Sequence, residues 1–256
     1  MICLTIEAGV IVARTDGRSP TSLRPISFET GFIAHHPGSV LVSFGGTRVL
    51  VTCTAENRVP SFRLNSGGGW VTADYQMLAA STHERRKKNP QRPDGRSMEI
   101  QRLIGRAVRN VVDLSHLGQR TLNIDCDVLQ ADGGTRTASI TGAYVALRLC
   151  LEDLAKKSDG ISPKAIDKIL TAQVAAVSLG VINGNIFTDL CYEEDSKADT
   201  DLNLIARHDG KIIEVQGTAE GAPLSRSELD GLVDQGLAAI EELCAHQRQA
   251  IERALS

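Results

Sequence analysis

The chain has 256 residues, of which 42% are hydrophobic and 23% are charged, an ordinary globular composition that excludes intrinsic disorder and collagen-like repeats. Its 28 Lys+Arg residues against 31 Asp+Glu residues give a net charge of −3, which argues against a protein that coats nucleic acid over its whole surface. No segment has the roughly 18 consecutive apolar residues that span a bilayer. Residues 1–13 contain Glu7 and no basic residue, so we expect neither a signal peptide nor membrane association.

The six cysteines lie far apart in the sequence and include no C-x-x-C pair. This spacing argues against a structural zinc site and against a disulfide framework. We therefore expect buried free thiols, as in a protein of the reducing cytoplasm.

The first half of the chain is predicted to alternate strands and helices. Residues 40–44 and 48–54 flank Gly45-Gly46, a dipeptide that allows the positive φ of a tight turn, so we expect an antiparallel hairpin. Apolar residues recur at helical spacing from Ile100 to Val111 and from Ile140 to Leu154, with a strand predicted at 121–128 between them.

The second half is predicted to contain two more hairpins and a final helix. Residues 174–182 and 186–192 flank Asn183-Gly184, and residues 202–207 and 211–216 flank Asp209-Gly210. Ser225 and Glu228 form a capping box that opens the last helix. The polar segment 156–168 connects the two halves. This order of elements favours an α+β fold in one domain, with helices packed on mixed and antiparallel β-sheets.

A glycine-rich turn at 130–137 is the first candidate binding site. Gly133 and Gly134 let the backbone approach a ligand, and the helix that follows presents free N–H groups and the positive end of its dipole. Thr135 and Arg136 add a hydroxyl and a guanidinium, which suit a phosphate. No Gly-Lys-Ser/Thr follows, so this is not a Walker A loop. The alternative is an ordinary strand–helix turn with an exposed arginine.

The acidic stretch at 193–201 is the second candidate. Asp195 and Asp201 are six residues apart, a spacing that places both on one face if the segment is extended. Two carboxylates on one face can hold a Mg²⁺ that keeps waters for substrate phosphates. The alternative is a solvated acidic loop, but the strands predicted on either side favour the metal site.

The third candidate is a basic run that leads into the first helix. Between residues 85 and 109 there are nine Lys+Arg residues against two acidic ones, and this local excess indicates a path for a polyanion. We expect residues 85–96 to form a mobile loop that orders on RNA. The helix that follows is predicted to carry three arginines on one face, with Glu99 as a counterion if the face is merely solvated: Arg102, Arg106 and Arg109.

A phosphate site, a metal site and a polyanion path together favour phosphoryl or nucleotidyl transfer. The sequence has no G-x-S-x-G elbow, and neither His83 nor His116 has an evident nucleophile as a partner. Hydrolysis by a serine or cysteine nucleophile is therefore disfavoured.

Five sequence blocks stand in one order along the chain: 69–73 (GWVTA), 98–106 (MEIQRLIGR), 125–137 (DCDVLQADGGTRT), 193–196 (EEDS) with Asp201, and 214–221 (EVQGTAEG). At these blocks the chain resembles the ribonuclease PH family, the phosphate-dependent 3′→5′ exoribonucleases that trim tRNA precursors. The resemblance runs from Arg14 to about Arg248.

The resemblance implies a fold, a site and an assembly. The fold is the RNase PH-like α+β fold, with a single catalytic domain at 14–256 preceded by an N-terminal extension at 1–13. Inorganic phosphate is the implied co-substrate and Mg²⁺ the implied cofactor. The assembly is a homohexameric ring, a trimer of dimers with active sites near the dimer interfaces. The family's catalytic positions match the phosphate ligands Arg96, Gly134, Thr135 and Arg136 and the metal-linked pair Asp195 and Asp201.

The chain departs from the family pattern before and within the basic run. Thr15 stands where the motif at the start of the family's sequences has a proline. Ala79-Ala80 stands where the family usually has Pro-Arg, and the basic loop that follows is about two residues shorter than is common in the family. The missing arginine would affect either the binding of tRNA or a contact between subunits. The basic run is expected to compensate for its loss. The candidate RNA-binding residues are Arg85, Arg86, Lys87, Lys88, Arg102 and Arg106.

The sequence thus predicts a phosphorolytic exoribonuclease and tRNA nucleotidyltransferase. Phosphate would attack the terminal 3′ phosphodiester and release a nucleoside 5′-diphosphate, and the reverse reaction would add nucleotides. The predicted partners are tRNA precursors and other RNA 3′ ends. Two alternatives stay open: a catalytically silent RNA-binding subunit of an exosome-like ring, and a hydrolytic nuclease. The retained arginines and aspartates argue against the first, and the phosphate cradle argues against the second.

Overall fold

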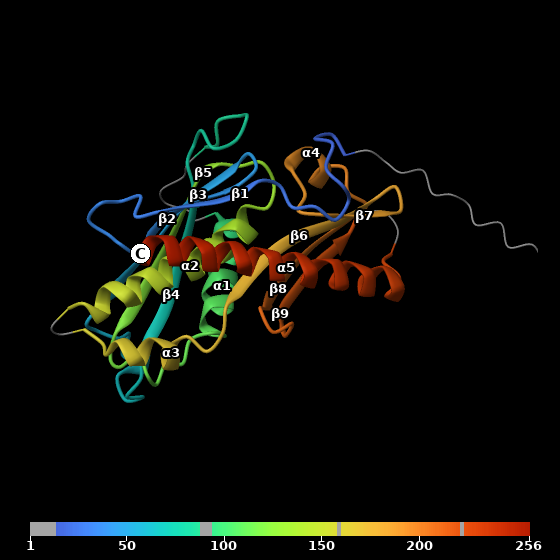
Figure 1. Cartoon of the computed structure of the whole chain (residues 1–256). Helices are drawn as coiled ribbons and strands as arrows, with labels where there is room; N and C mark the ends of the chain where they lie inside the picture. The colour runs from blue at the N-terminus through green and yellow to red at the C-terminus, as the bar shows by residue number, and fades with distance from the viewer. Residues whose placement is uncertain (1–13, 88–93, 158–159, 221–222) are drawn as a thin grey trace, which may run out of the picture.

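The computed structural model describes residues 14–87, 94–157, 160–220 and 223–256, arranged as two β-sheets with helices packed between and across them (Figure 1). The predicted extension at 1–13 lies outside the described residues. Within these ranges, no helix is both long enough and apolar enough to cross a membrane. The described cysteines are all free thiols, and four of the five are buried, as the sequence predicts.

The first sheet is mixed. Its order is β1 (Ile26–Thr30), β2 (Ser39–Phe44), β3 (Thr47–Glu56), β5 (Thr121–Gln130) and β4 (Trp70–Met77). All neighbouring pairs are antiparallel except β4 and β5, which are parallel. Parallel neighbours need a crossover connection, and α1 (Gly95–Arg109) supplies it and packs on β4.

The second sheet is wholly antiparallel. Its order is β7 (Asn185–Thr188), β6 (Val174–Ile182), β8 (Thr200–Arg207) and β9 (Ile212–Ala219). The turn between β6 and β7 contains Asn183 and Gly184, both with positive φ. The hairpins predicted at the Gly-Gly, Asn-Gly and Asp-Gly dipeptides are therefore confirmed.

Helix α2 (Thr135–Ala155) joins the two sheets in one core. It packs on β2 and β3 of the first sheet, on β6 of the second and on α5 (Arg226–Leu255). Most of its residues are buried, since a helix covered on all sides needs no polar stripe. The contact with the first sheet is close: a Cβ placed on Gly142 would lie 2.4 Å from Val42 Cγ2.

Helix α5 closes the outer side of this core, running across β6 and β8 (Figure 1). The buried amide of Gln247 on α5 donates to the carbonyls of Thr141 on α2 and Val174 on β6, each at 2.9 Å. One buried hydrophobic cluster includes residues of both sheets and all three long helices. This continuity supports the predicted single catalytic domain at 14–256, which stays a prediction.

The structure differs from the prediction at one strand end, in two further strands and in several short helices. The strand predicted at 186–192 is too long: β7 ends at Thr188, and α4 (Tyr192–Asp195) follows. The reason is Asp189, which has a φ of 57° and turns the chain out of the sheet. Strands β1 and β4 were not predicted, nor were three short helices: η1 (Ser61–Arg63), η2 (Pro163–Ala165) and α3 (Ile166–Ile169).

Candidate active site

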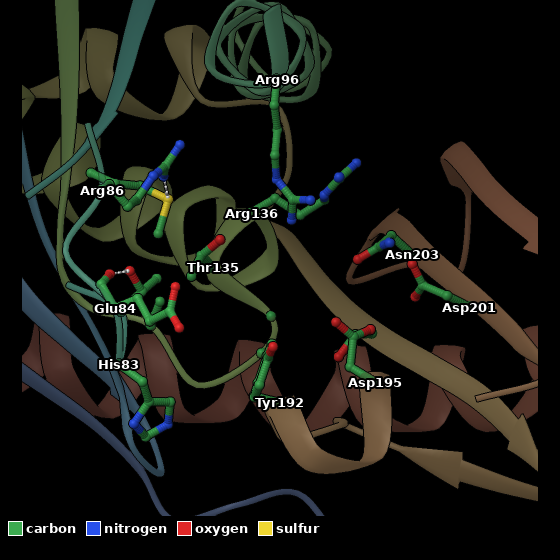
Figure 2. Close-up of a pocket in the computed structure, with 16 residues that line it drawn as sticks. His83, Glu84, Arg86, Arg96, Thr135, Arg136, Tyr192, Asp195, Asp201 and Asn203 are labelled. Carbon is green, nitrogen blue, oxygen red and sulfur yellow. Dashed lines mark hydrogen bonds between the residues drawn. The ribbon is translucent and has the colours of Figure 1, made fainter. Parts of the chain in front are cut away.

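A cavity of about 660 Å³ lies where the starts of α1 and α2 meet α4 and β8 (Figure 2). All six residues predicted as phosphate or metal ligands line it. Those residues are Arg96, Gly134, Thr135, Arg136, Asp195 and Asp201. The fold thus brings together side chains that are up to 105 residues apart in the sequence, from Arg96 to Asp201.

The two arginines occupy equivalent places in their helices. Arg96 is the second residue of α1 and Arg136 the second residue of α2, and neither helix has an acidic residue in its first turn. A cation is disfavoured at the positive end of a helix dipole. Two cations placed there against the same cavity therefore concentrate positive potential, which an anion such as phosphate would neutralise.

The glycine-rich turn needs both of its glycines. Gly133 and Gly134 have φ values of 73° and 63°, in the left-handed region that other residues avoid. A Cβ on Gly133 would lie 2.6 Å from the carbonyl oxygen of Leu190. The turn therefore packs directly on the segment that leads into α4, and this contact places the glycine-rich turn next to the helix that carries Asp195.

The two arginines differ in how they are held. Arg136 Nη1 donates to Glu99 Oε1 at 3.1 Å and to Gln216 Oε1 at 2.8 Å, so this guanidinium is oriented by α1 and β9. The side chain of Arg96 is exposed and makes no hydrogen bond or ion pair with any described residue. Arg136 is thus a fixed donor, and Arg96 is a cation whose charge is open to a ligand.

The acidic pair converges in a different way from the prediction. Asp195 ends the short helix α4, and Asp201 is the second residue of β8, so the segment between them is not extended. The extended segment on which the shared face was conditional is not formed, because residues 192–195 form a helical turn. The carboxylates still face one cavity, since the chain turns back between α4 and β8 (Figure 2).

Burial and mutual repulsion raise the pKa values of this pair. Burial raises the pKa of Asp201 to about 6, and the charge of Asp195 adds to the rise, while Arg136 and Arg96 oppose it. Burial also raises the pKa of Asp195, against the pull of Arg96 and Arg136. The Oδ1 atom of Asp201 is buried and has no hydrogen-bond partner within the described residues. Such an unpaired oxygen is the environment that a divalent cation compensates.

The segment that carries Asp195 is braced by two buried arginines that the sequence prediction missed. Arg14 forms a two-pronged salt bridge with Glu194, at 2.8 and 2.7 Å, and its Nη1 donates to the carbonyl of Thr188 at 2.7 Å. Arg24 pairs in the same way with Asp189, at 3.0 and 2.7 Å. The sequence shows no local signal for these pairs, because the partners lie more than 160 residues apart.

The candidate RNA-binding residues lie around the cavity in unequal positions. Arg86 lines the cavity and pairs with Asp94 at 2.8 Å, Arg85 and Lys87 are exposed beside it, and Lys88 lies outside the described residues. On α1, Arg102 is exposed, whereas Arg106 makes two hydrogen bonds of 2.8 Å with Glu214.

Arg109 does not share the exposed arginine face predicted for α1. Its guanidinium stacks on Trp70 at 4.7 Å from the ring centroid and donates to the carbonyl of Val71. This arginine therefore serves the packing of α1 on β4.

Comparison with known proteins shows the family of this chain. The model of the 3′ exoribonuclease family, domain 1, matches residues 22–151, and the model of domain 2 matches residues 172–239. A ribonuclease PH of Crocosphaera subtropica is 49% identical over 241 residues, which are 94% of this chain and 98% of that protein. The chain belongs to the ribonuclease PH family. The resemblance seen in the sequence blocks is confirmed.

Other members of the family agree. A ribonuclease PH of Mycolicibacterium smegmatis is 49% identical over 241 residues, covering 93% of this chain and 92% of that protein. Membership in the ribonuclease PH family carries the enzyme class that the sequence predicts, a phosphorolytic 3′ exoribonuclease of the tRNA nucleotidyltransferase type, with RNA as substrate and phosphate as co-substrate.

Solved structures show that the fold is shared more widely than the sequence. A chain of the Archaeoglobus fulgidus exosome, determined with RNA bound to the active site, has a TM-score of 0.75 at 23% identity and covers 91% of this chain and 91% of its own length. Rice Rrp46 has a TM-score of 0.73 at 18% identity and covers 93% of this chain and 100% of its own. The predicted RNase PH-like α+β fold is confirmed.

Proposed function

We propose that the protein shortens the 3′ ends of tRNA precursors and other RNAs one nucleotide at a time, with inorganic phosphate as the attacking group. The observation that carries this proposal is the meeting of two helix-start arginines, a double-glycine turn and a buried carboxylate pair in one cavity. The reverse reaction adds nucleotides from nucleoside diphosphates.

Arg96, Arg136 and the N–H groups around Gly134 and Thr135 would hold the attacking phosphate. The first N–H groups of α2 have no partner within the helix, so they are free to bind an oxyanion. Phosphate is already an anionic nucleophile, and therefore positioning and charge neutralisation matter more than a strong general base. A phosphate oxygen forms a bond to the terminal phosphorus, and the bond from that phosphorus to the 3′ oxygen of the preceding nucleotide breaks. The products are a nucleoside 5′-diphosphate and an RNA with a new 3′-hydroxyl.

Asp195 and Asp201 suit a Mg²⁺ better than a metal bound entirely by protein. No group of three or more His, Cys, Asp or Glu side chains fit to hold a metal occurs in the part of the chain that the structure describes. Mg²⁺ commonly takes one or two carboxylates and fills its shell with waters and substrate phosphates. Bound there, it would supply charge stabilisation to the scissile phosphate and to the departing 3′ oxygen. The unpaired Oδ1 of Asp201 supports this assignment.

The assembly, the RNA contacts and the location belong to the same proposal. Membership in the ribonuclease PH family supports a homohexameric ring and a cytoplasmic location.

Neutralising the four residues of the basic run together should lower both the affinity for tRNA and its dependence on salt. Unchanged affinity and salt dependence would show that the run does not compensate for the missing arginine. The residues of the run are Arg85, Arg86, Lys87 and Lys88.

One assay separates the proposed activity from its two alternatives. RNA is incubated with the protein and Mg²⁺, with and without phosphate, and the products are identified. Nucleoside diphosphates that form only with phosphate are the expected result. Nucleoside monophosphates without phosphate would indicate a hydrolytic nuclease, and an absence of products under both conditions would indicate a silent ring subunit.

A further inference from the structure

Two aromatic rings border the cavity on the side away from the arginines. Tyr192, the first residue of α4, and His83 both line the cavity. Their ring centroids are 6.3 Å apart and their planes are inclined by 51°. Figure 2 shows Arg96 and Arg136 on one side of the cavity, Tyr192 and His83 on the other, and the two aspartates beside them.

Tyr192 has a fixed backbone and a largely exposed side chain. Its backbone N–H donates to Asp132 Oδ1 at 3.1 Å, which fixes the start of α4 against the glycine-rich turn. The residue is 56% exposed. Neither aromatic side chain makes a hydrogen bond within the described ranges, and the two rings contact each other. Both rings therefore remain available to a ligand in the cavity.

The cavity has room for more than a phosphate. Its volume of about 660 Å³ is in the range of pockets that take small organic ligands. Tyr192 precedes Asp195 by three residues on α4, a spacing that places both on one face of the helical turn. A nucleotide whose phosphate lies at the arginines and carboxylates would therefore bring its base to the aromatic side.

We propose that the Tyr192 ring stacks on the base of the 3′-terminal nucleotide of the RNA, with His83 supporting the ring. This inference rests on the proposed function, because it requires an RNA 3′ end in this cavity. An enzyme that removes successive nucleotides has to hold every base in turn. Stacking on an aromatic ring tolerates sequence because every base has a π-face. Tyr192 is thus assigned as a substrate-positioning residue.

The kinetic test compares two variants on two RNAs. Tyr192→Ala removes the ring and Tyr192→Phe keeps it, and one of the RNAs carries an abasic 3′-terminal nucleotide. On ordinary RNA, Tyr192→Ala should raise KM for RNA about tenfold, while Tyr192→Phe should behave as the wild type. On the abasic RNA, Tyr192→Ala should have no effect, since there is no base to stack. Equal losses on both RNAs, or a loss in Tyr192→Phe equal to that in Tyr192→Ala, would overturn the proposal.

Phe32→Ala is the matched control, because it removes another exposed aromatic ring that does not line the cavity. It should leave KM for both RNAs unchanged. Thermal unfolding of Tyr192→Ala should match that of the wild type, since the ring is largely exposed and buries little surface.

A binding measurement without turnover separates this inference from the proposed activity. An RNA with 2-aminopurine as its 3′-terminal base, mixed with protein in the absence of phosphate, should lose fluorescence on binding to the wild type and not on binding to Tyr192→Ala. Normal phosphorolysis with equal quenching by both proteins would refute the stacking role alone. Quenching by the wild type only, without release of diphosphates when phosphate is added, would refute the proposed activity alone.

Discussion

The guanidinium of Arg14 and the carboxylate of Glu194 form a buried, two-pronged salt bridge, with N–O distances of 2.8 and 2.7 Å. The bridge joins the segment before β1 to α4, across a separation of 180 residues. Glu194 also accepts a hydrogen bond from the N–H of Cys191 at 3.1 Å, which stabilises the start of the helix. The position of the neighbouring Asp195 in the active site therefore depends on a charge from the other end of the chain.

Removing one partner of this bridge should destabilise the protein strongly. Arg14→Leu leaves the buried Glu194 carboxylate without its counterion, and we expect a loss of about 3–5 kcal/mol in the free energy of unfolding, measured by denaturant titration. The double variant with Glu194→Leu should recover part of the loss, because it leaves no unpaired charge. The control is Arg148→Leu, which breaks the half-buried Arg148–Glu152 pair on α2 and should cost clearly less. Equal losses for Arg14→Leu and Arg148→Leu would contradict the account.

The same bridge should make the stability depend on acid. Burial by itself raises the pKa of Glu194, but the hydrogen bonds from Arg14 and from the Cys191 N–H outweigh it and lower the pKa below its ordinary 4.5. The stability from this group is therefore present above pH 4.5 and is lost as the pH falls through the lowered pKa. Unfolding of the wild type measured across this range should show a steeper acid loss than unfolding of the Arg14→Leu, Glu194→Leu double variant. Parallel curves would contradict the role of the bridge.

Asp201→Asn should abolish the metal site without disturbing the phosphate cradle. The substitution removes one of two carboxylates, and we expect phosphorolysis to fall by about 100-fold or more while the affinity for phosphate is kept. Mg²⁺ should raise the melting temperature of the wild type and not that of the variant, a readout that does not depend on activity. Asp199→Asn is the control, since Asp199 is exposed and accepts from the N–H of Asn183 outside the cavity. Full activity of Asp201→Asn would refute the assignment.

The raised pKa of Asp201 predicts a pH-dependent requirement for Mg²⁺. Burial and the charge of Asp195 raise this pKa to about 6, so the carboxyl is protonated below that pH and binds a cation poorly. The Mg²⁺ concentration for half-maximal activity should be constant well above pH 6 and rise about tenfold per pH unit below it. The stability of the metal-free protein should change with pH as well. Because the pKa of Asp201 is raised in the folded state, protonation of this carboxyl favours folding, and this contribution to the free energy of unfolding is lost as the pH rises through 6. A Mg²⁺ requirement that does not change between pH 5 and 8 would contradict the prediction.

Arg96 should act on phosphate through both its charge and its shape. Arg96→Lys keeps the charge but loses the planar fork, so KM for phosphate should rise by about tenfold, and Arg96→Ala should raise it further. KM for RNA should change less than KM for phosphate. Arg102→Lys, at an exposed position on the same helix that does not line the cavity, is the control and should leave KM for phosphate unchanged. A uniform rise in both KM values for Arg96→Ala would contradict its assignment to the attacking phosphate.

Much of the fold was predictable because its signals are local. A hairpin follows from the two glycines at 45–46, and the start of α5 follows from Ser225 and Glu228, which bond to each other's backbone N–H groups at 3.2 and 2.8 Å. The family was predictable for the same reason, since its motifs are unbroken blocks of sequence.

The features that could not be predicted from the sequence depend on contacts between distant segments. Strand β7 ends before Asp189, whose buried carboxylate accepts hydrogen bonds from Arg24, 165 residues earlier in the sequence. Arg109 lies on the same arginine-rich helix as Arg102, but only the position of Trp70 decides that it packs and does not face solvent. Helical periodicity describes one element at a time and contains no information about which neighbour meets it.

The sequence by itself determined the net charge of −3, the family, most of the long helices and strands and the residue types of the candidate site. Only the tertiary structure decided which of the many charges meet: the buried salt bridges of Arg14 and Arg24, the open charge of Arg96, and the burial and repulsion that raise the pKa of Asp201. The physical reason is that a charge costs or gains free energy according to its burial and its partners. Both are properties of the folded chain.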